Sequence, residues 1–307
     1  MKKLVTIIVP TIGRPQYIGA TIESILRQDY EEIEILISDN VPDTPTRLIL
    51  GNNMDSRIRV VERDRRYGFS EHMNLCIDDA RGQYLMILSD DDLISPSYVS
   101  SLVELFSENR NVIVGLGQQE VLNETNVSLS ENVITRSLRT IDGMEYCLSH
   151  FQGKQMFPIY TYLSLFARKA DVVAAGRFKL YPDGSHADNY LFYSLALKGK
   201  IGLSSGLMGY RVYSTSFGLS TPFRKLYQAS LEYDKDMSKL LWSLESQPFS
   251  KRLKLRLLAK KSVVWMLKYR LFNLYKARLG LFSSIVELCR VILWFLPANI
   301  FFGLGRR

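Results

Sequence analysis

Three consecutive aspartates, Asp90, Asp91 and Asp92, directly follow a short apolar run at residues 84–89. An apolar run of this length is typical of a strand that is buried on both faces of a parallel sheet. Three carboxylates at the end of such a strand repel one another unless a cation neutralises them. Because oxygen ligands suit hard divalent ions, the pattern predicts a site for Mg²⁺ or Mn²⁺ and phosphate. The alternative is a solvated acidic turn that caps the following helix.

Runs of β-branched residues alternate with helical patterns in the first part of the chain. Strands are expected at residues 5–9, 33–38, 58–61 and 84–89, and helices at residues 15–28, 70–81 and 95–108. Gly82 is expected to end the second helix. This alternation predicts a doubly wound, mostly parallel α/β domain. Asp39 and the aspartate trio (residues 90–92) each follow a predicted strand, where ligands bind in such sheets. The two strand ends could supply acceptors for a nucleotide and a metal for its phosphates.

Several short motifs occur in a fixed order along residues 4–215. They are Ile8-Val9-Pro10-Thr11 with Arg14, Ile37-Ser38-Asp39-Asn40, Gly68 with Asn74, Ala80-Arg81-Gly82-Gln83-Tyr84, Leu88-Ser89-Asp90-Asp91-Asp92, Pro96, Ala175-Gly176-Arg177-Phe178 and Ala187-Asp188. In this order and spacing, the chain resembles the family 2 glycosyltransferases. The resemblance implies the GT-A fold, a Rossmann-like, mostly parallel central sheet flanked by helices. It also implies a nucleotide-diphospho-sugar as donor.

The resemblance assigns roles at the donor site. Pro10 and Thr11 would line the nucleotide pocket, and Asp39 would bond to the base.

Within the aspartate trio, Asp91 would bind the metal directly. Asp90 and Asp92 would contact the donor ribose or the water around the metal, so Asp90 is assigned to the donor and Asp92 to the metal.

The sequence also departs from the family pattern. Ile12 and Gly13 stand where the family usually has Tyr and Asn, which leaves the identity of the base open. Ser89 replaces the first Asp of the commoner cluster, and Ala187 replaces a Glu before Asp188.

Positive charges are expected near the donor phosphates. Arg14, Arg66 and Arg81 are the candidates, with solvated surface residues as the alternative, and Arg81 is favoured because it immediately precedes the aspartate strand. Tyr210-Arg211 fits such a position more weakly. Aromatic residues stack on sugars, so residues 160–162 and Tyr181 are candidates for the acceptor side, with ordinary packing as the alternative.

Sugar transfer also needs a base for the acceptor hydroxyl, while a carboxylate-held divalent cation neutralises the departing diphosphate. Direct attack from the opposite face inverts the anomeric configuration. Asp188 stands where the family carries its catalytic base, at the start of a predicted helix; the alternative is an N-cap. His186 is a second candidate base.

The C-terminal part of the chain is basic and apolar. Residues 251–307 contain thirteen Lys and Arg residues and one acidic residue, Glu287, for a net charge of +12 against −4 in the first 250 residues. A bilayer span needs about 20 apolar residues, and the apolar segment at residues 281–304 is interrupted by Glu287, Arg290 and Pro297. We expect an interfacial or re-entrant helix on an anionic membrane. The alternative is a helical subdomain packed on the catalytic core or on another copy, which would allow an oligomer.

These observations predict a glycosyltransferase domain at residues 1–222 and a helical, membrane-associating region at residues 223–307. The predicted enzyme is metal-dependent and inverting, and it acts on a saccharide or lipid-linked saccharide at the cytoplasmic face of the inner membrane, as a peripheral protein of bacterial surface polysaccharide synthesis. Three scattered cysteines fit a reducing compartment. The apolar stretch before Pro10 is too short for a signal peptide.

Three other function classes are weighed against this prediction. The first is a basic nucleic-acid-binding protein, which would have no use for the aspartate trio. A catalytically inactive nucleotide-sugar-binding module would not need Asp188. A nucleotidyltransferase would want a glycine- and lysine-rich phosphate loop, which residues 11–16 do not provide.

Overall fold

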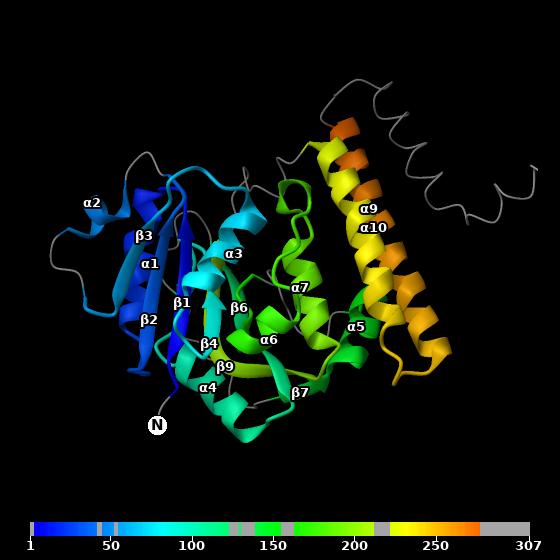
Figure 1. Cartoon of the computed structure of the whole chain (residues 1–307), viewed down its shortest axis with the longest axis horizontal. Coiled ribbons are helices and arrows are strands. Elements are labelled where there is room, and N and C mark those ends of the chain that lie inside the picture. The colour runs from blue at the N-terminus through cyan, green and yellow to red at the C-terminus, as the bar shows by residue number, and fades with distance from the viewer. Residues whose placement is uncertain are drawn as a thin grey trace, which may run out of the picture.

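A computed structural model describes residues 3–41, 45–51, 55–122, 129, 139–154, 163–211 and 222–276. Within these residues, one mixed β-sheet is covered by helices on both faces, and a pair of long helices flanks one side of the molecule (Figure 1). The strands follow the order β3-β2-β1-β4-β8-β6-β9-β5, and β7 pairs with β9 outside this path. The α/β architecture predicted from the sequence is confirmed.

The first half of the sheet is parallel, as the sequence predicted. Its strands are β1 (Val5–Thr11), β2 (Ile33–Asp39), β3 (Ile58–Glu62) and β4 (Tyr84–Ile87). The helices between and after them are α1 (Pro15–Leu26), α2 (Thr46–Leu50), α3 (Phe69–Asp79) and α4 (Tyr98–Glu108). Because these four strands are parallel, their carboxyl ends lie together at one end of the sheet.

The second half of the sheet mixes strand directions and was not assigned from the sequence. It contains β5 (Leu93–Ile94), β6 (Val112–Leu122), β7 (Arg139–Asp142), β8 (Phe166–Arg168) and β9 (Lys200–Arg211). Strand β6 is parallel to β9, whereas β8 is antiparallel to β4 and β6, and β5 and β7 are antiparallel to β9. The helical elements here are α5 (Gly143–Phe151), α6 (Lys169–Ala174), the 3₁₀ turn η1 (Pro182–Gly184) and α7 (Ala187–Ala196).

Alternating side chains of β1 build two hydrophobic cores. Val5, Ile7 and Val9 belong to the cluster that includes residues of α1 and α4. Ile8 belongs to the other cluster, with residues of α3, α5 and α7. All four side chains are fully buried, which explains why this strand reads as a continuous apolar run.

Gly82 has a different role from the one its sequence suggested. Helix α3 ends at Asp79, two residues before the predicted end at residue 81. The Gly82 N–H donates to the Thr6 hydroxyl over 2.7 Å, and a Cβ at this position would lie 2.5 Å from the Thr6 backbone nitrogen. Gly82 is therefore needed for close approach of two backbones, and the prediction that it stops the helix is wrong.

The Gly82→Ala substitution should lower the free energy of unfolding by about 1–3 kcal/mol, because the added methyl group meets backbone that cannot move cheaply. The matched control is Gly19→Ala within α1, where a Cβ meets nothing within 4 Å; it should stabilise by about 0.5–1 kcal/mol. Urea denaturation of the two variants gives both values. Equal effects would contradict the close-approach role.

The C-terminal helices share a hydrophobic core with the α/β part of the chain. Helices α9 (Phe223–Trp242) and α10 (Phe249–Lys276) lie side by side as a hairpin (Figure 1). Tyr233 of α9 and Leu255 of α10 are buried in the same cluster as Cys147 of α5 and Tyr190 of α7. These helices therefore pack on the α/β part of the chain, and the domain boundary at residue 222 stays a prediction.

Two expectations for the C-terminal region remain predictions. The apolar segment at residues 281–304 lies outside the described residues. Among the residues described up to position 276, no helix is both long enough and apolar enough to cross a membrane.

Candidate active site

The ends of three parallel strands bring the candidate residues together. Thr11 at the end of β1 lies opposite Asp39 at the end of β2 in the sheet register. On the other side of β1, the Leu88 N–H donates to the Ile8 carbonyl over 2.9 Å, so β1 stays paired with the chain beyond β4. The aspartate trio follows directly, at the same carboxyl edge of the sheet.

A tight turn presents the aspartate trio. The Asp92 N–H donates to the Ser89 carbonyl over 3.1 Å, which closes a four-residue turn with Asp90 and Asp91 at its centre. The three residues are buried, with exposed fractions of 1%, 5% and 1%. The alternative of a solvated acidic turn is therefore wrong.

Arg14 and Thr11 bind the first two aspartates. The Arg14 guanidinium forms ion pairs with Asp90 and, over 2.6 Å, with Asp91. The Thr11 hydroxyl donates to Asp90 and accepts the Gly13 N–H over 3.0 Å. Gly13 has a φ of 82°, in the left-handed region that glycine adopts without steric cost. The family's usual Asn also tolerates this region, so the departure at Gly13 keeps the backbone turn that brings Arg14 to the aspartates.

Arg211, at the end of β9, contacts the aspartate trio through a different element. It is buried, its N–H donates to Asp92 Oδ1 over 3.0 Å, and its Nε donates to the Asp91 carbonyl over 3.1 Å. Its guanidinium lies 5.0 Å from the ring centroid of Tyr17 in α1. The sequence indicated this position only weakly, because the contact joins residues 119 positions apart through the pairing of β5 with β9.

The aspartate trio fits a divalent cation that shares its coordination with phosphate. Burial, together with the charge of Asp91, raises the pKa of Asp92 well above its usual value. Among the residues that the structure describes, no group of three His, Cys, Asp or Glu side chains forms a metal cage. Mg²⁺ is usually held by one or two carboxylates and completed by substrate phosphates. Asp91 and Asp92 provide hard oxygen ligands of this kind.

Asp188 is the second residue of α7, and the N-cap position belongs to His186. The N-cap alternative for Asp188 is therefore wrong. The residue is only partly exposed, and burial raises the pKa of its carboxyl group.

His186, the second candidate base, has structural contacts with α9. Its φ of 68° is uncommon for a residue with a side chain. Its Nε2 hydrogen-bonds with the Ser230 hydroxyl over 3.0 Å, and its ring stacks on Tyr233 with centroids 5.0 Å apart. Burial lowers its pKa to about 4, so the ring stays neutral at ordinary pH. His186 therefore joins the start of α7 to α9.

Tyr210 precedes Arg211 at the end of β9. Burial raises the pKa of its phenol, and the negative charges of Asp92, Asp91 and Asp188 raise it further. Asp188 itself lies on α7, which packs against α5, α9 and β6.

Asp39 is engaged with the start of α2. Its carboxylate accepts the Thr46 N–H over 2.9 Å and also the Thr46 hydroxyl. Each carboxylate oxygen keeps a further lone pair, so contact with a nucleotide base stays a prediction. Pro10 lies partly buried at the same edge, opposite Ser38 of β2.

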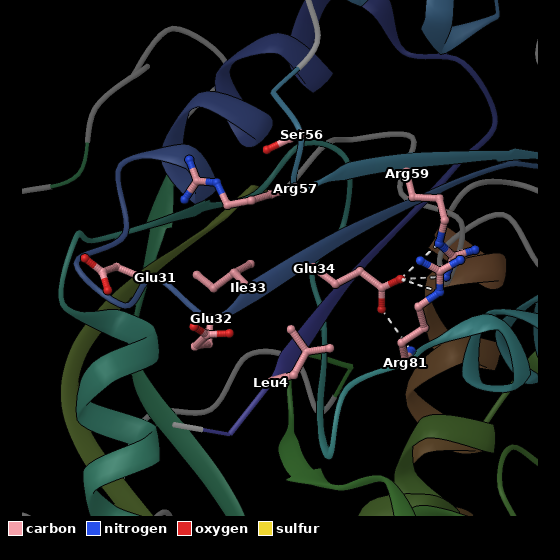
Figure 2. A pocket seen from close by; sticks show the side chains of 9 residues that line it. All are labelled: Leu4, Glu31, Glu32, Ile33, Glu34, Ser56, Arg57, Arg59 and Arg81. Atoms are coloured by element: carbon pink, nitrogen blue, oxygen red, sulfur yellow. Dashed lines mark hydrogen bonds and ion pairs between the residues drawn. The ribbon is translucent and has the colours of Figure 1, made fainter. Parts of the chain in front are cut away.

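Arg81 lies beside the amino ends of the strands, at the opposite end of the sheet from the aspartate trio. Its N–H donates to Glu34 Oε2 over 2.9 Å, and its Nε is 3.8 Å from Glu34 Oε1. Both residues line an open pocket at the amino ends of the strands, together with Arg57 and Arg59 (Figure 2). Because the length of β4 separates Arg81 from the trio, the prediction that Arg81 binds donor phosphates is wrong. Arg14 is the predicted arginine that the structure places at the trio.

The predicted acceptor aromatics are only partly described. Tyr181 is buried, its hydroxyl donates to Asp236 over 3.1 Å, and its ring packs edge-on against Tyr190 and Tyr233. It therefore has the packing role that was its alternative. Residues 160–162 lie outside the described residues.

The family model described as glycosyl transferase family 2 matches residues 6–171. The chain belongs to this family. The match covers β1 to β8 and the aspartate trio, while Asp188, Tyr210 and Arg211 lie beyond it.

Relatives with assigned names support the same family. The chain is 29% identical to the glycosyltransferase GlyG of Streptococcus pneumoniae over 118 residues, which are 38% of this chain and 39% of GlyG. It is 24% identical over 249 residues to the GalNAc(5)-diNAcBac-PP-undecaprenol β-1,3-glucosyltransferase of Campylobacter jejuni, covering 77% of each chain. The structure of S. aureus TarS residues 1–349 with UDP-GlcNAc superposes with a TM-score of 0.67 at 14% identity, covering 94% of this chain and 80% of TarS 1–349. This likeness shows the GT-A fold.

Replacing Arg14 with Met should lower the free energy of unfolding by about 1–3 kcal/mol, because two buried carboxylates lose their ion-pair partner. The Arg14 side chain is 34% exposed, which keeps the loss below that of a fully buried pair. Mn²⁺ should restore more stability to this variant than to the wild type, because a cation can replace the guanidinium charge. Urea denaturation with and without Mn²⁺ measures both effects.

The matched control is Arg47→Met, since Arg47 pairs with Glu62 where the side chains are 50% and 56% exposed. Its stability should change by less than about 0.5 kcal/mol. If Arg14→Met lowered the free energy of unfolding as little as this control, the Arg14 guanidinium would not be neutralising the charge of the aspartate trio.

Proposed function

We propose that this family 2 glycosyltransferase is a metal-dependent, inverting enzyme that transfers a sugar from a nucleotide-diphospho-sugar to a hydroxyl of a lipid-linked saccharide. The observation that carries the proposal is the buried aspartate trio, which Arg14, Thr11 and Arg211 contact at the carboxyl ends of the strands. Asp188 on α7 is a separate carboxyl group, and burial raises its pKa. Donor activation would use the first group and base catalysis the second.

The carboxyl edge of β1, β2 and β4 is the proposed donor site. Thr11, Asp39 and Asp90 face this edge from different strand ends, and Pro10 precedes Thr11. The matching TarS structures contain UDP-GlcNAc or UDP, which supports a nucleotide donor for this chain. Ile12, in place of the family's usual Tyr, is 47% exposed at this edge and offers an apolar surface without a ring.

Asp91 and Asp92 would hold Mn²⁺ or Mg²⁺ together with the donor diphosphate. The cation would neutralise the charge that develops on the departing diphosphate. Arg14 and Arg211 add fixed positive charge beside these carboxylates, so they would bind and orient the same diphosphate.

Asp188 would take the proton from the acceptor hydroxyl as that oxygen attacks the anomeric carbon. Attack from the face opposite the leaving group would invert the configuration, and Asp188 would serve the acceptor on that face. Burial raises its pKa, which makes the carboxylate a stronger base than a solvated aspartate.

The acceptor class is inferred from a relative. The C. jejuni enzyme acts, by its name, on an undecaprenol-diphosphate-linked saccharide. A similar acceptor would place this protein at the cytoplasmic face of the inner membrane as a peripheral enzyme of surface polysaccharide synthesis. The net charge of +12 in residues 251–307 supports this location.

The Asp91→Ala variant should lose transfer and also the Mn²⁺ dependence of nucleoside diphosphate binding, because it removes the proposed direct ligand. It should stay folded, since removing one of three clustered carboxylates relieves repulsion. Calorimetric titration of nucleoside diphosphates with and without Mn²⁺ tests this. Asp55→Ala, in a surface pair with Arg57, is the control. Undiminished Mn²⁺-dependent binding by Asp91→Ala would remove Asp91 from the metal site.

The Asp188→Asn variant should bind donor normally but turn over about 10²–10⁴-fold more slowly, because an amide cannot accept the proton. In the wild type, kcat/KM should fall as the pH drops through the pKa of Asp188. This decline should begin at a higher pH than for a solvated aspartate, because burial raises that pKa. Steady-state kinetics across pH measure both effects. Turnover within a few-fold of wild type would show that Asp188 is not the base.

A further inference from the structure

The helical hairpin exposes a cluster of large apolar side chains. Trp242, Phe249, Leu253 and Leu257 have exposed fractions of 40%, 62%, 37% and 61%. The Trp242 and Phe249 rings stack with centroids 5.5 Å apart at the turn between α9 and α10. Phe249, Leu253 and Leu257 follow at steps of four residues, so they form one stripe along α10. We name these four residues the hairpin patch.

Helix α10, which carries three of the four patch residues, has basic but no acidic side chains. Helix α10 has nine Lys and Arg residues and no Asp or Glu, namely Lys251, Arg252, Lys254, Arg256, Lys260, Lys261, Lys268, Arg270 and Lys276. Lys254, three residues before Leu257, and Lys261, four residues after it, are both exposed. Neither lysine forms an ion pair with a described acidic residue.

The acidic residues of α9 are directed elsewhere. Asp234 pairs with Arg256 over 2.8 Å between the helices. Asp236 accepts the Tyr181 hydroxyl and lies 4.0 Å from Lys179 of the catalytic part. Glu245, in the turn, is the acidic residue nearest to the patch along the chain. The patch therefore combines an apolar stripe with positive charge that the hairpin does not neutralise.

We infer that the hairpin patch docks the protein on an anionic lipid surface. Phenylalanine, leucine and tryptophan side chains would enter the boundary between headgroups and acyl chains, while the lysine ammonium groups reach the lipid phosphates. Charge complementarity selects this occupant: an apolar stripe flanked by unneutralised lysines matches a surface that is apolar below a layer of negative charge.

This inference deepens the proposed function and rests on it for the acceptor class. A lipid-linked acceptor stays in the bilayer, so docking would raise its concentration at the enzyme. The surface is also distinct from residues 277–307, because the patch lies on helices that are packed into the protein core.

The first test places a polarity-sensitive fluorophore on single cysteines of the full-length chain. The labelled position is Leu257→Cys, in a background with Cys289→Ser and with the buried Cys76 and Cys147 unchanged. The control is Leu48→Cys on α2, a leucine with an exposed fraction of 75% on the side of the molecule away from the hairpin (Figure 1). Vesicles of phosphatidylcholine and phosphatidylglycerol are the probe.

Emission from position 257 should shift to the blue and be quenched by brominated acyl chains, whereas emission from position 48 should not change. Vesicle binding without any change at position 257 would overturn the inference, because other residues would then bind the lipid. A blue shift without vesicles that grows with protein concentration would overturn it in favour of a second copy as the occupant.

The second test reverses the charges beside the stripe. Lys254→Glu with Lys261→Glu should lower partitioning into anionic vesicles about tenfold or more, and high salt should weaken the wild type toward the same value. The control is Lys154→Glu with Lys198→Glu, which changes the net charge equally at other exposed lysines. Equal losses in both pairs would show that only net charge matters and would overturn the patch.

These measurements need neither donor nor acceptor. If vesicle contact fails while transfer still depends on Asp91 and Asp188, the docking surface is wrong and the proposed chemistry stands. If docking holds while Asp188→Asn turns over normally, the proposed chemistry is wrong instead.

Discussion

The ion pairs between Arg14 and the aspartates at the end of β4 make the buried site electrostatically possible. Carboxylates so close together and so little exposed would otherwise favour their protonated forms, and the raised pKa of Asp92 shows that the balance is incomplete. One guanidinium on Asp90 and Asp91 and a second, Arg211, on the backbone of Asp91 keep the cluster compact. A divalent cation at Asp91 and Asp92, as proposed above, would add the positive charge that this balance lacks.

The mixed half of the sheet supplies what the parallel half lacks. Strands β1, β2 and β4 can deliver residues only to their own carboxyl edge, which provides the donor side. Pairing of β5 with β9 returns the chain to that edge from a distant part of the sequence and places Tyr210 and Arg211 there. Helix α7 then adds Asp188. The candidate donor residues thus come from the parallel half of the sheet. The candidate residues Asp188, Tyr210 and Arg211 come from α7 and from β9 in the mixed half.

The sequence predicted the parallel half well because its strands are continuous apolar runs and its helices have regular periodicity. Short strands such as β8, with three residues, take their structure from their neighbours and carry little local signal. The aspartate trio was predicted because the cost of clustered carboxylates is visible in the sequence itself. Arg211 was indicated only weakly, because its position depends on the long-range pairing of β5 with β9. The prediction for Arg81 was wrong because it considered only that Arg81 is next to β4 in the sequence. A residue that precedes a strand lies at the strand's amino end, whereas the aspartate trio follows β4 at its carboxyl end.

The contact of His186 with Ser230 and Tyr233 extends the catalytic framework beyond the region that defines the family. His186 holds the first turn of α7, which contains Asp188, and it is itself held by α9. A displacement of α9 would reach the candidate base through one hydrogen bond and one ring contact. The position of Asp188 is thus coupled through His186 to α9, so a helix that supports the fold also holds the start of α7 in place.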